Sequence, residues 1–342
     1  MIDDIQLARS VKQQNLRNLI TRRNVVGVGV GFKETSDGLT DKLAVVVNVA
    51  QKLPKAQLAE SDKVPKDING VKTDVVETGR FLAGQLPAGA LPTKERWPGP
   101  GPIPPGVSLS HADVTAGTFG CLVRRGRDIF ILSNNHVLAN VNSGKPGDAI
   151  IQPGRYDGGK PQDKVAELAE FVPLDFGGDS ARSGLFVNIE KLLNKLAGLF
   201  GSDHRVMAYR TSPGENLLDA ALARPLDPAR FSAGILSIGL PAGVAEATLG
   251  TAVQKTGRTT GFTRGRITQI DVTTAVDYNG RAATFTDQLM ASGMSDGGDS
   301  GSVVLDEQRR VVGLLFAGSP RATLLTPIQT VLKTFNVEMV TQ

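Results

Sequence analysis

The chain has 342 residues, which suits two domains, and 40% of them are hydrophobic, so ordinary packed cores are expected. The formal net charge is only +4 and Lys and Arg are scattered, which argues against a dedicated nucleic-acid binder; aromatic residues, at 5%, are too few for base-stacking platforms. The 39 Gly and 19 Pro residues favour a β-rich protein with many turns over a helical bundle.

Residues 1–83 predict a small α+β domain. Apolar residues at helical spacing predict an amphipathic helix over residues 1–23. Residues 24–32 alternate β-branched residues with Gly, which is the period of a strand. This run has the wrong spacing for a phosphate-binding loop and leads into no helix. The domain is completed by a buried strand over 43–49, a short helix near 54–60 and a strand near 71–77.

The cysteine content and the first residues bear on location. The single cysteine, Cys121, forbids an intrachain disulfide and lies in an apolar run, so we expect a buried strand residue. Met1 leads into Ile-Asp-Asp, with no basic stretch followed by an apolar one, so no secretory signal is expected. No apolar run approaches the roughly 18 residues of a membrane span. These features together predict a cytoplasmic protein that does not bind membranes.

Residues 84–108 are crowded with Pro and Gly and predict a semi-extended linker with polyproline character. We therefore place a domain boundary here. Such a linker is also a favoured site for proteolytic nicking, including cleavage by the protein itself.

Residues 109–342 predict a β domain, because short strands are frequent there and the turns are rich in Gly. The runs 119–124 and 128–133 predict a hairpin around an Arg-Gly-Arg turn. This arrangement favours a barrel or a sandwich. Further strands are expected near residues 148–152, 164–172, 205–209, 218–223, 265–276, 282–290, 302–305 and 311–317.

One helix interrupts the predicted strands. Residues 186–200 carry Phe, Ile and Leu at helical spacing, with Glu, Lys and Asn on the opposite face. Such an amphipathic helix packs on its own barrel, forms a contact between copies of the chain, or adsorbs to a membrane surface. The sequence leaves these three alternatives open.

Two segments carry candidate catalytic residues. Residues 131–138 deliver His136 to the end of an apolar strand, although a lone His in this position is more often structural. Asp219 is embedded in the apolar run 217–223. A buried carboxylate is costly unless it is paired, and an imidazole N–H is an economical partner. An Asp before an apolar run also ends turns, so neither segment is specific alone.

A third segment, residues 296–304 (Asp-Gly-Gly-Asp-Ser-Gly-Ser-Val-Val), places Ser300 between small residues before an apolar strand. Small neighbours let a substrate carbonyl approach the hydroxyl, and they let the backbone N–H groups of Gly298 and Ser300 point at a developing oxyanion. A Ca²⁺-binding or turn loop is the structural alternative. The order His, Asp, Ser along the chain favours a serine protease with Ser300 as nucleophile and His136 as general base.

The motifs resemble the three motif blocks of the chymotrypsin-like (trypsin-like) serine proteases, and the resemblance covers the chain from about residue 115 to residue 330. A further Gly-Arg-Thr-Thr-Gly stretch resembles a hairpin of bacterial and plant members. Together with Phe-Thr-Asp-Gln-Leu it is similar to the narrow-leaf-type intracellular trypsin-like proteases of plants. The segments in question are 132–136, 218–222, 298–302, 255–265 and 285–289.

The resemblance implies a mainly β, chymotrypsin-like double β-barrel with an inserted helix, preceded by the small α+β domain. It implies a triad in which Asp219 orients His136 and His136 activates Ser300, with Gly298 and Ser300 forming the oxyanion hole. Asp299 matches the family's structural Asp, and an internal Arg is the expected partner of its carboxylate. No metal or organic cofactor is implied.

By the family's spacing, Met294 lies at the base of the specificity pocket, and Phe316, Ala317 and Gly318 form its wall. No acidic residue falls at this base, so strict cleavage after Lys or Arg is not expected, and a small or medium apolar residue is favoured. Weaker candidates for the triad carboxylate are Asp175 and Asp203. The other two histidines, His111 and His204, are expected to be solvated, and no His/Cys cluster predicts a zinc site.

The sequence therefore predicts an intracellular serine endopeptidase that acts on protein or peptide substrates through an acyl-enzyme. The alternative is a protease-fold scaffold or interaction protein that is catalytically idle or cuts only itself. Contacts between identical copies are expected through residues 186–200 or the N-terminal domain.

Overall fold

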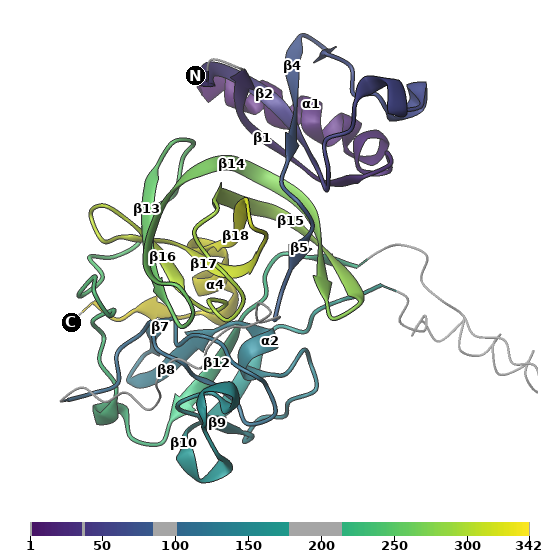
Figure 1. Ribbon diagram of the computed structural model, residues 1–342. Helices are drawn as coiled ribbons and strands as arrows, with labels where there is room; N and C mark the ends of the chain where they lie inside the picture. The colour runs from purple at the N-terminus through teal and green to yellow at the C-terminus, as the bar shows by residue number, and fades with distance from the viewer. Residues whose placement is uncertain (1, 36–37, 85–100, 178–213, 342) are drawn as a thin grey trace, which may run out of the picture.

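The fold is mainly β, with two barrels and a small α+β N-terminal region, which confirms the predicted fold class (Figure 1). The expected helix over 186–200 and the expected strand near 205–209 lie outside the described residues. The computed structural model describes residues 2–35, 38–84, 101–177 and 214–341.

The N-terminal region places one helix on a twisted sheet. Helix α1 buries Ala8, Val11 and Leu19 against β1 and β2. The short helix expected near 54–60 is instead two 3-10 turns, which bury no side chain and therefore lack an apolar face that would support an α-helix. The elements are α1 (Ile2–Ile20), β1 (Val25–Thr35), β2 (Gly38–Val49), η1 (Lys55–Gln57), η2 (Glu60–Asp62), β3 (Asp67–Ile68) and β4 (Val71–Glu77).

The Gly–Val alternation of β1 has a structural explanation. Strand β1 pairs with β14 (Gly261–Tyr278), so the N-terminal region and one barrel share a sheet. A Cβ atom at Gly31 would lie 2.7 Å from the carbonyl oxygen of Thr268, and one at Gly29 would lie 2.6 Å from Oε1 of Gln269. Glycine at these positions therefore permits the close approach of β14.

The second barrel is a closed ring in which β14, β15, β18, β17, β16 and β13 pair in turn and β13 returns to β14. The sequence predicted four of these strands and missed β13 and β18. Helix α4 (Ile328–Phe335), also missed, packs on β17 and β18. The remaining strands are β13 (Ala252–Gly257), β15 (Arg281–Ser292), β16 (Val303–Asp306), β17 (Val311–Gly318) and β18 (Ala322–Pro327), with β5 (Phe81–Leu82) and β11 (Glu215–Asn216) at the margin.

The first barrel is built on a second sheet, in the order β19-β7-β8-β12-β10-β9-β6. Cys121 lies on β7 and is 1% exposed, as its apolar neighbours predict, and burial raises the pKa of its thiol. The elements are β6 (Ser110–His111), β7 (Cys121–Arg125), β8 (Asp128–Ser133), α2 (Asn135–Leu138), β9 (Ala149–Ile151), η3 (Arg155–Asp157), η4 (Pro161–Asp163), β10 (Lys164–Phe171), β12 (Ala221–Pro225), η5 (Pro228–Arg230) and β19 (Glu338–Met339).

The described end of the predicted linker packs on the first barrel. The Ile103 N–H donates to the carbonyl oxygen of Arg230 at 2.7 Å, and the Gly106 N–H donates to that of Phe119 at 2.7 Å. Residues 103–106 are buried. This end of the segment is therefore part of the barrel surface.

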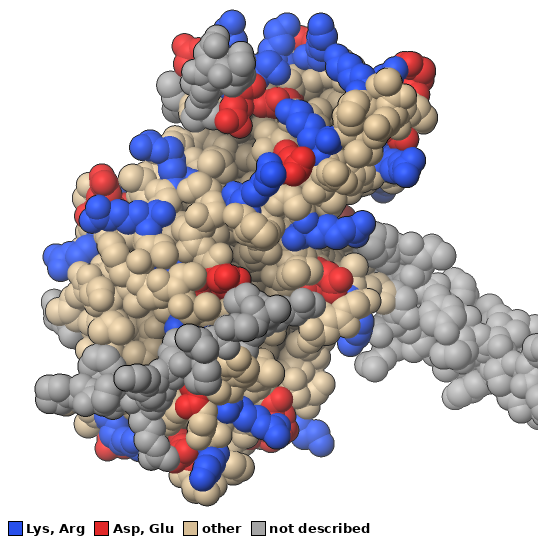
Figure 2. All heavy atoms as spheres, in the orientation of Figure 1, with Lys and Arg blue, Asp and Glu red and all other residues tan. Residues whose placement is uncertain are grey.

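Charged side chains of both signs are interspersed over the face seen in Figure 2, and neither sign forms one large region there. Within the described parts of the chain, no helix combines the length and the apolar character needed to span a membrane.

Candidate active site

His136 and Asp219 are brought together by the pairing of two strands. Strand β8 pairs with β12, with Ser133 opposite Ala221. His136 lies three residues beyond Ser133, on α2, and Asp219 lies two residues before Ala221. Asp219 Oδ2 is 2.5 Å from His136 Nδ1, and Asp219 Oδ1 accepts the backbone N–H of His136 at 3.2 Å. The two side chains are 1% and 0% exposed, so this pair is buried at the junction of sheet and helix.

Tyr278 is a member of this site that the sequence reading missed. Its hydroxyl donates to Asp219 Oδ2 at 2.8 Å, and its ring makes an edge contact with His136, with centroids 5.7 Å apart. Burial, followed by the charge of Asp219, raises the pKa of Tyr278 well above its ordinary value, so the phenol remains a neutral donor. Tyr278 ends β14 beside a hairpin turn, and no local pattern indicated this contact.

The loop that carries Ser300 packs closely against the end of β8. The Thr118 N–H donates to the carbonyl oxygen of Ser300 at 2.9 Å, and the Ser133 hydroxyl donates to that of Thr118 at 2.8 Å. Gly301 has a φ of +95°, and a Cβ there would lie 2.1 Å from the Ser133 hydroxyl oxygen. Glycine at this position therefore lets the Ser300 loop reach the strand that leads to His136.

The Ser300 hydroxyl is not hydrogen-bonded to His136. It donates to the carbonyl oxygen of Phe316 at 3.3 Å, whereas Nε2 of His136 is buried and has no hydrogen-bond partner within the described part of the chain. The N–H groups of Gly298 and Ser300 have no hydrogen-bond acceptor among the described residues. The structure thus joins His136 to Asp219 directly and leaves the hydroxyl turned toward β17.

The partner of Asp299 is Lys255, which corrects the expectation of an internal Arg. Lys255 Nζ is 3.1 Å from Asp299 Oδ2, and both side chains are 0% exposed. The carboxylate also accepts the N–H groups of Thr259 and Thr260, at 2.7 and 3.1 Å, and the Thr260 hydroxyl at 2.6 Å. Burial lowers the pKa of Lys255, and the charge of Asp299 opposes this effect. The nearby Arg258 instead pairs with Asp157.

Three of the predicted specificity-pocket residues, Met294, Phe316 and Ala317, belong to two different apolar clusters. Phe316 and Ala317 lie in a cluster with Tyr278 and Phe285, and the rings of Phe285 and Phe316 are 4.7 Å apart. Met294 is buried in the other cluster, in the second barrel core. Gly318 ends β17, and a Cβ there would lie 3.1 Å from the Ser295 hydroxyl.

Two of the other candidate residues, Asp175 and His111, have hydrogen-bond partners elsewhere. The Asp175 carboxylate accepts the N–H of Gly177 at 2.8 Å. His111 was expected to be solvated, but it is 5% exposed, and its Nε2 is 3.2 Å from Asp148 Oδ2; pairing with β9 buries it. Asp203 and His204 lie outside the described residues. In the described part of the chain, no group of three His, Cys, Asp or Glu side chains is placed to hold a metal ion.

Comparisons with known proteins bear on the region that contains these residues. Residues 117–314, more than half of the chain, match the family model of the trypsin-like peptidase domain. The chain is similar to chymotrypsin of Cellulomonas bogoriensis (16% identity, TM-score 0.43, covering 70% of this chain and 99% of that one). It is also similar to Thermobifida fusca Protease A (17% identity, TM-score 0.45, covering 70% and 99%). No curated protein matches the chain.

Proposed function

The chain belongs to the trypsin-like peptidase family, and on that premise we propose that it is a serine endopeptidase whose catalytic triad is Ser300, His136 and Asp219. The observation that carries the proposal is the buried contact of 2.5 Å between His136 Nδ1 and Asp219 Oδ2, beside the loop of Ser300. An imidazole oriented by a carboxylate is the arrangement that general-base activation of a hydroxyl requires.

In the proposed reaction, Ser300 Oγ attacks the scissile carbonyl carbon while Nε2 of His136 removes the hydroxyl proton. The carbon–nitrogen bond then breaks, His136 gives this proton to the leaving amine, and Ser300 is left as an acyl ester. Water, deprotonated by His136, hydrolyses the ester and restores the serine. The unpartnered Nε2 of His136 is available for each of these proton transfers.

Two further groups have proposed roles in the same reaction. The N–H groups of Gly298 and Ser300 would donate to the oxyanion of the tetrahedral intermediate, where losing one such donor costs about 10²–10³ in turnover. Asp219 would hold the tautomer of His136 and stabilise the imidazolium, since its carboxylate contacts Nδ1. Asp299, fixed by Lys255, would hold the shape of the loop between Gly298 and Ser300.

A second candidate function, a catalytically idle or only self-cleaving scaffold, is favoured by one observation. The Ser300 hydroxyl donates to the carbonyl oxygen of Phe316 instead of to His136. In a scaffold this bond would persist, whereas in an enzyme the hydroxyl would turn to His136 when a substrate binds. Hydrogen bonds of catalytic groups are often misaligned before substrate binds, so we favour the enzyme.

The test is cleavage of a mixed peptide library, with new termini identified by mass spectrometry. We expect the wild-type chain to cleave and Ser300→Ala to lose that activity. Ser302→Ala is the matched control, because its hydroxyl lies two residues away and donates to the carbonyl oxygen of Asp299. Library cleavage that persists in Ser300→Ala would contradict the proposal, and so would its loss only in Ser302→Ala.

A further inference from the structure

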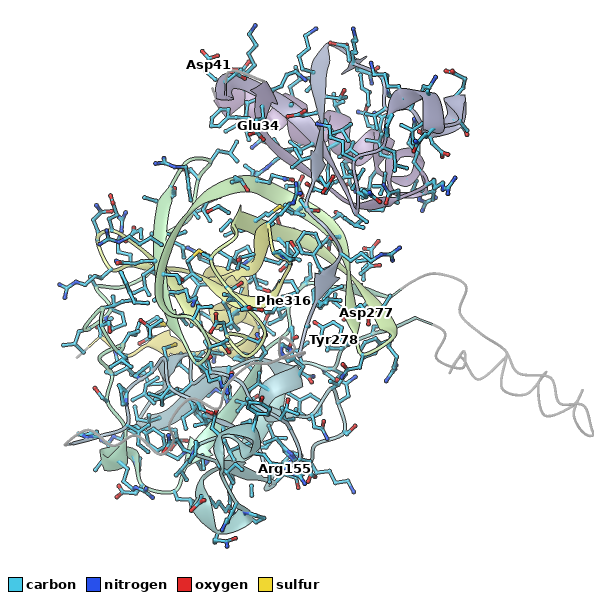
Figure 3. All side chains as sticks on the ribbon, in the orientation of Figure 1. Glu34, Asp41, Arg155, Asp277, Tyr278 and Phe316 are labelled. Carbon is cyan, nitrogen blue, oxygen red and sulfur yellow. The ribbon has the colours of Figure 1, made fainter. Side chains whose placement is uncertain are left out.

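Strand β5 inserts between two strands of the second barrel. Phe81 and Leu82 pair in parallel with Val276 and Asp277 of β14, and Leu82 pairs antiparallel with Gly318 of β17. The Ala83 N–H donates to the carbonyl oxygen of Asp277 at 3.0 Å. In Figure 1, β5 descends from β4 along the side of the second barrel, where Figure 3 labels Asp277, Tyr278 and Phe316.

The register of this pairing leads the chain to the candidate nucleophile. Because Leu82 lies opposite Gly318 and the strands run antiparallel, continuing this register by two residues would bring Gly84 opposite Phe316. The carbonyl oxygen of Phe316 is the group that accepts the Ser300 hydroxyl. A Cβ at Gly84 would lie 3.5 Å from Cδ2 of His136. Gly84 therefore lies beside the ring of His136.

Side chains along this segment alternate as they do in a bound strand. Phe81 is 1% exposed, packed in the cluster that contains Phe285 and Phe316, whereas Leu82 is 40% exposed. Ala83 is buried again. The barrel thus encloses one large apolar side chain, that of Phe81, and one small one, that of Ala83.

The residues just before β5 are held by contacts with the turn that follows β17. The Ser319 hydroxyl donates to the carbonyl oxygen of Thr78 at 2.5 Å, and Arg321 pairs with Glu77 at 2.9 Å. Both Ser319 and Arg321 follow β17 directly in the chain. Residues 77–82 are therefore held at the end of β17 and at the turn after it by backbone pairing, a hydroxyl contact and a charge pair.

We propose that residues 81–84 occupy, within the same chain, the groove that binds a substrate on the amino side of its scissile bond. This inference rests on the proposed function and adds a substrate class to it. A substrate from another molecule must displace β5 and add its own strand to β17, a mode in which main-chain hydrogen bonds give affinity and side-chain pockets give specificity. It should carry a large apolar residue three positions before the residue whose carbonyl is attacked, and small residues at the last two positions.

The first test measures occupancy of the groove without catalysis, on the Ser300→Ala background. Because the Ala83 N–H points at β14, the N–H of Leu82 points at β17, and Leu82→Pro removes it. Leu82→Ala is the matched control, since the side chain is largely exposed and the backbone donor is kept. The probe is a fluorescein-labelled peptide with the sequence of residues 78–84, Thr-Gly-Arg-Phe-Leu-Ala-Gly, followed by fluorescence anisotropy.

We expect the Leu82→Pro chain to bind the probe at least about tenfold more tightly than the Leu82→Ala chain, because the competing strand is released. A probe with Ala in place of its Phe should bind neither chain. Equal binding of the first probe by the two folded chains would overturn the inference. If circular dichroism shows Leu82→Pro unfolded, Phe81→Ala replaces it, with Phe81→Leu as its control and the same expected ratio.

The second test restores Ser300 and measures cleavage of the peptide library. Leu82→Pro should cleave about tenfold faster than Leu82→Ala, at sites with a large apolar residue three positions before the scissile residue. If the probe binds Leu82→Pro but no chain cleaves, the proposed function fails and the occupied groove stands. If the Leu82→Pro and Leu82→Ala chains cleave the library at equal rates and bind the probe with equal affinity, the inference fails and the proposed function stands.

Discussion

A completely buried carboxylate lies beside each barrel, Asp219 beside the first and Asp299 in the second, and the two have different partners. Asp219, beside the first barrel, is held by the imidazole of His136, the hydroxyl of Tyr278 and a backbone N–H. Asp299, in the second barrel, is held by the ammonium of Lys255, the Thr260 hydroxyl and three backbone N–H groups. Both side chains are 0% exposed, so each needs its partners to offset the cost of burial.

The difference between these partners separates the proposed roles. An imidazole gains and loses a proton near neutral pH, so a carboxylate paired with it stabilises a charge that appears during a reaction. An ammonium ion paired with a carboxylate in a buried site takes no part in proton transfer in this proposal, and the pair fixes the shape of the loop. We therefore expect loss of Asp219 function to affect turnover and loss of the Asp299 partner to affect folding.

The largest expected effect is on turnover in Asp219→Asn. The amide keeps the shape of the side chain but favours the wrong tautomer of His136, and the equivalent change in a Ser-His-Asp protease lowers kcat by about 10⁴. Rates of library cleavage would measure it. Asp175→Asn, in the same interval of the chain, should retain activity, because the Asp175 carboxylate accepts the N–H of Gly177. A loss of equal size in Asp175→Asn would remove the distinction we draw between these carboxylates.

The next effect is on stability in Lys255→Met. Removing one partner leaves the carboxylate of Asp299 buried and uncompensated, which typically costs about 3–5 kcal/mol. Denaturant unfolding followed by circular dichroism measures this loss. The surface pair of Lys164 and Glu167, 2.7 Å apart, gives the control, because Lys164→Met should cost less than about 1 kcal/mol. Similar costs for the two variants would show that the buried pair is not a structural anchor.

A smaller effect is expected in Tyr278→Phe, which removes one donor to Asp219 and keeps the ring. A hydrogen bond to a charged group contributes about 1.5–3 kcal/mol, so kcat should fall tenfold or more. KM should change little, since the hydroxyl contacts Asp219 and no part of the groove. An unchanged kcat with a lowered melting temperature would reduce Tyr278 to a packing residue.

The smallest effect concerns the second His–Asp contact, between His111 and Asp148, which has no catalytic role in this account. The Lys145 N–H, and then His111, lower the pKa of Asp148 below its ordinary value. A depressed carboxyl pKa adds stability above the unfolded pKa of about 3.9, and this stability is lost as the pH falls through the folded value. Asp148→Asn should therefore lower the free energy of unfolding by less than about 1 kcal/mol at pH 7. The difference in melting temperature between the wild type and this variant should disappear below about pH 4. A difference in melting temperature that grows as the pH falls below about 4 would contradict a lowered pKa of Asp148 in the folded protein.

The sequence predicted what local pattern determines. The alternating strands, the buried Cys121 and the mainly β double barrel follow from periodicity, composition and motif resemblance. It also pointed to His136, Asp219 and Ser300 because each sits in a short, recognisable segment, although their roles are still predictions. Partners that depend on tertiary packing were not predictable in this way. Tyr278 reaches Asp219 across 59 positions, and Lys255 reaches Asp299 across 44.

The pairing of residues 81–84 with the second barrel was likewise not predictable from the local sequence. Nothing in this short apolar segment indicates that it would pair with β17, because the pairing depends on the edge that the second barrel offers. The burial of His111 likewise depends on β9, which lies about forty residues further along the chain. Such contacts depend on strands that are distant in the sequence, and the local pattern of one strand does not identify its partner.

The most direct test of the account is to locate the adduct of a fluorophosphonate, which reacts with activated serine hydroxyls, by tandem mass spectrometry. The Leu82→Pro chain offers the reagent the most open groove under our inference. We predict one adduct, on Ser300, that disappears in the His136→Ala version of the same chain. An adduct on another serine, or labelling of Ser300 that persists undiminished without His136, would contradict the triad.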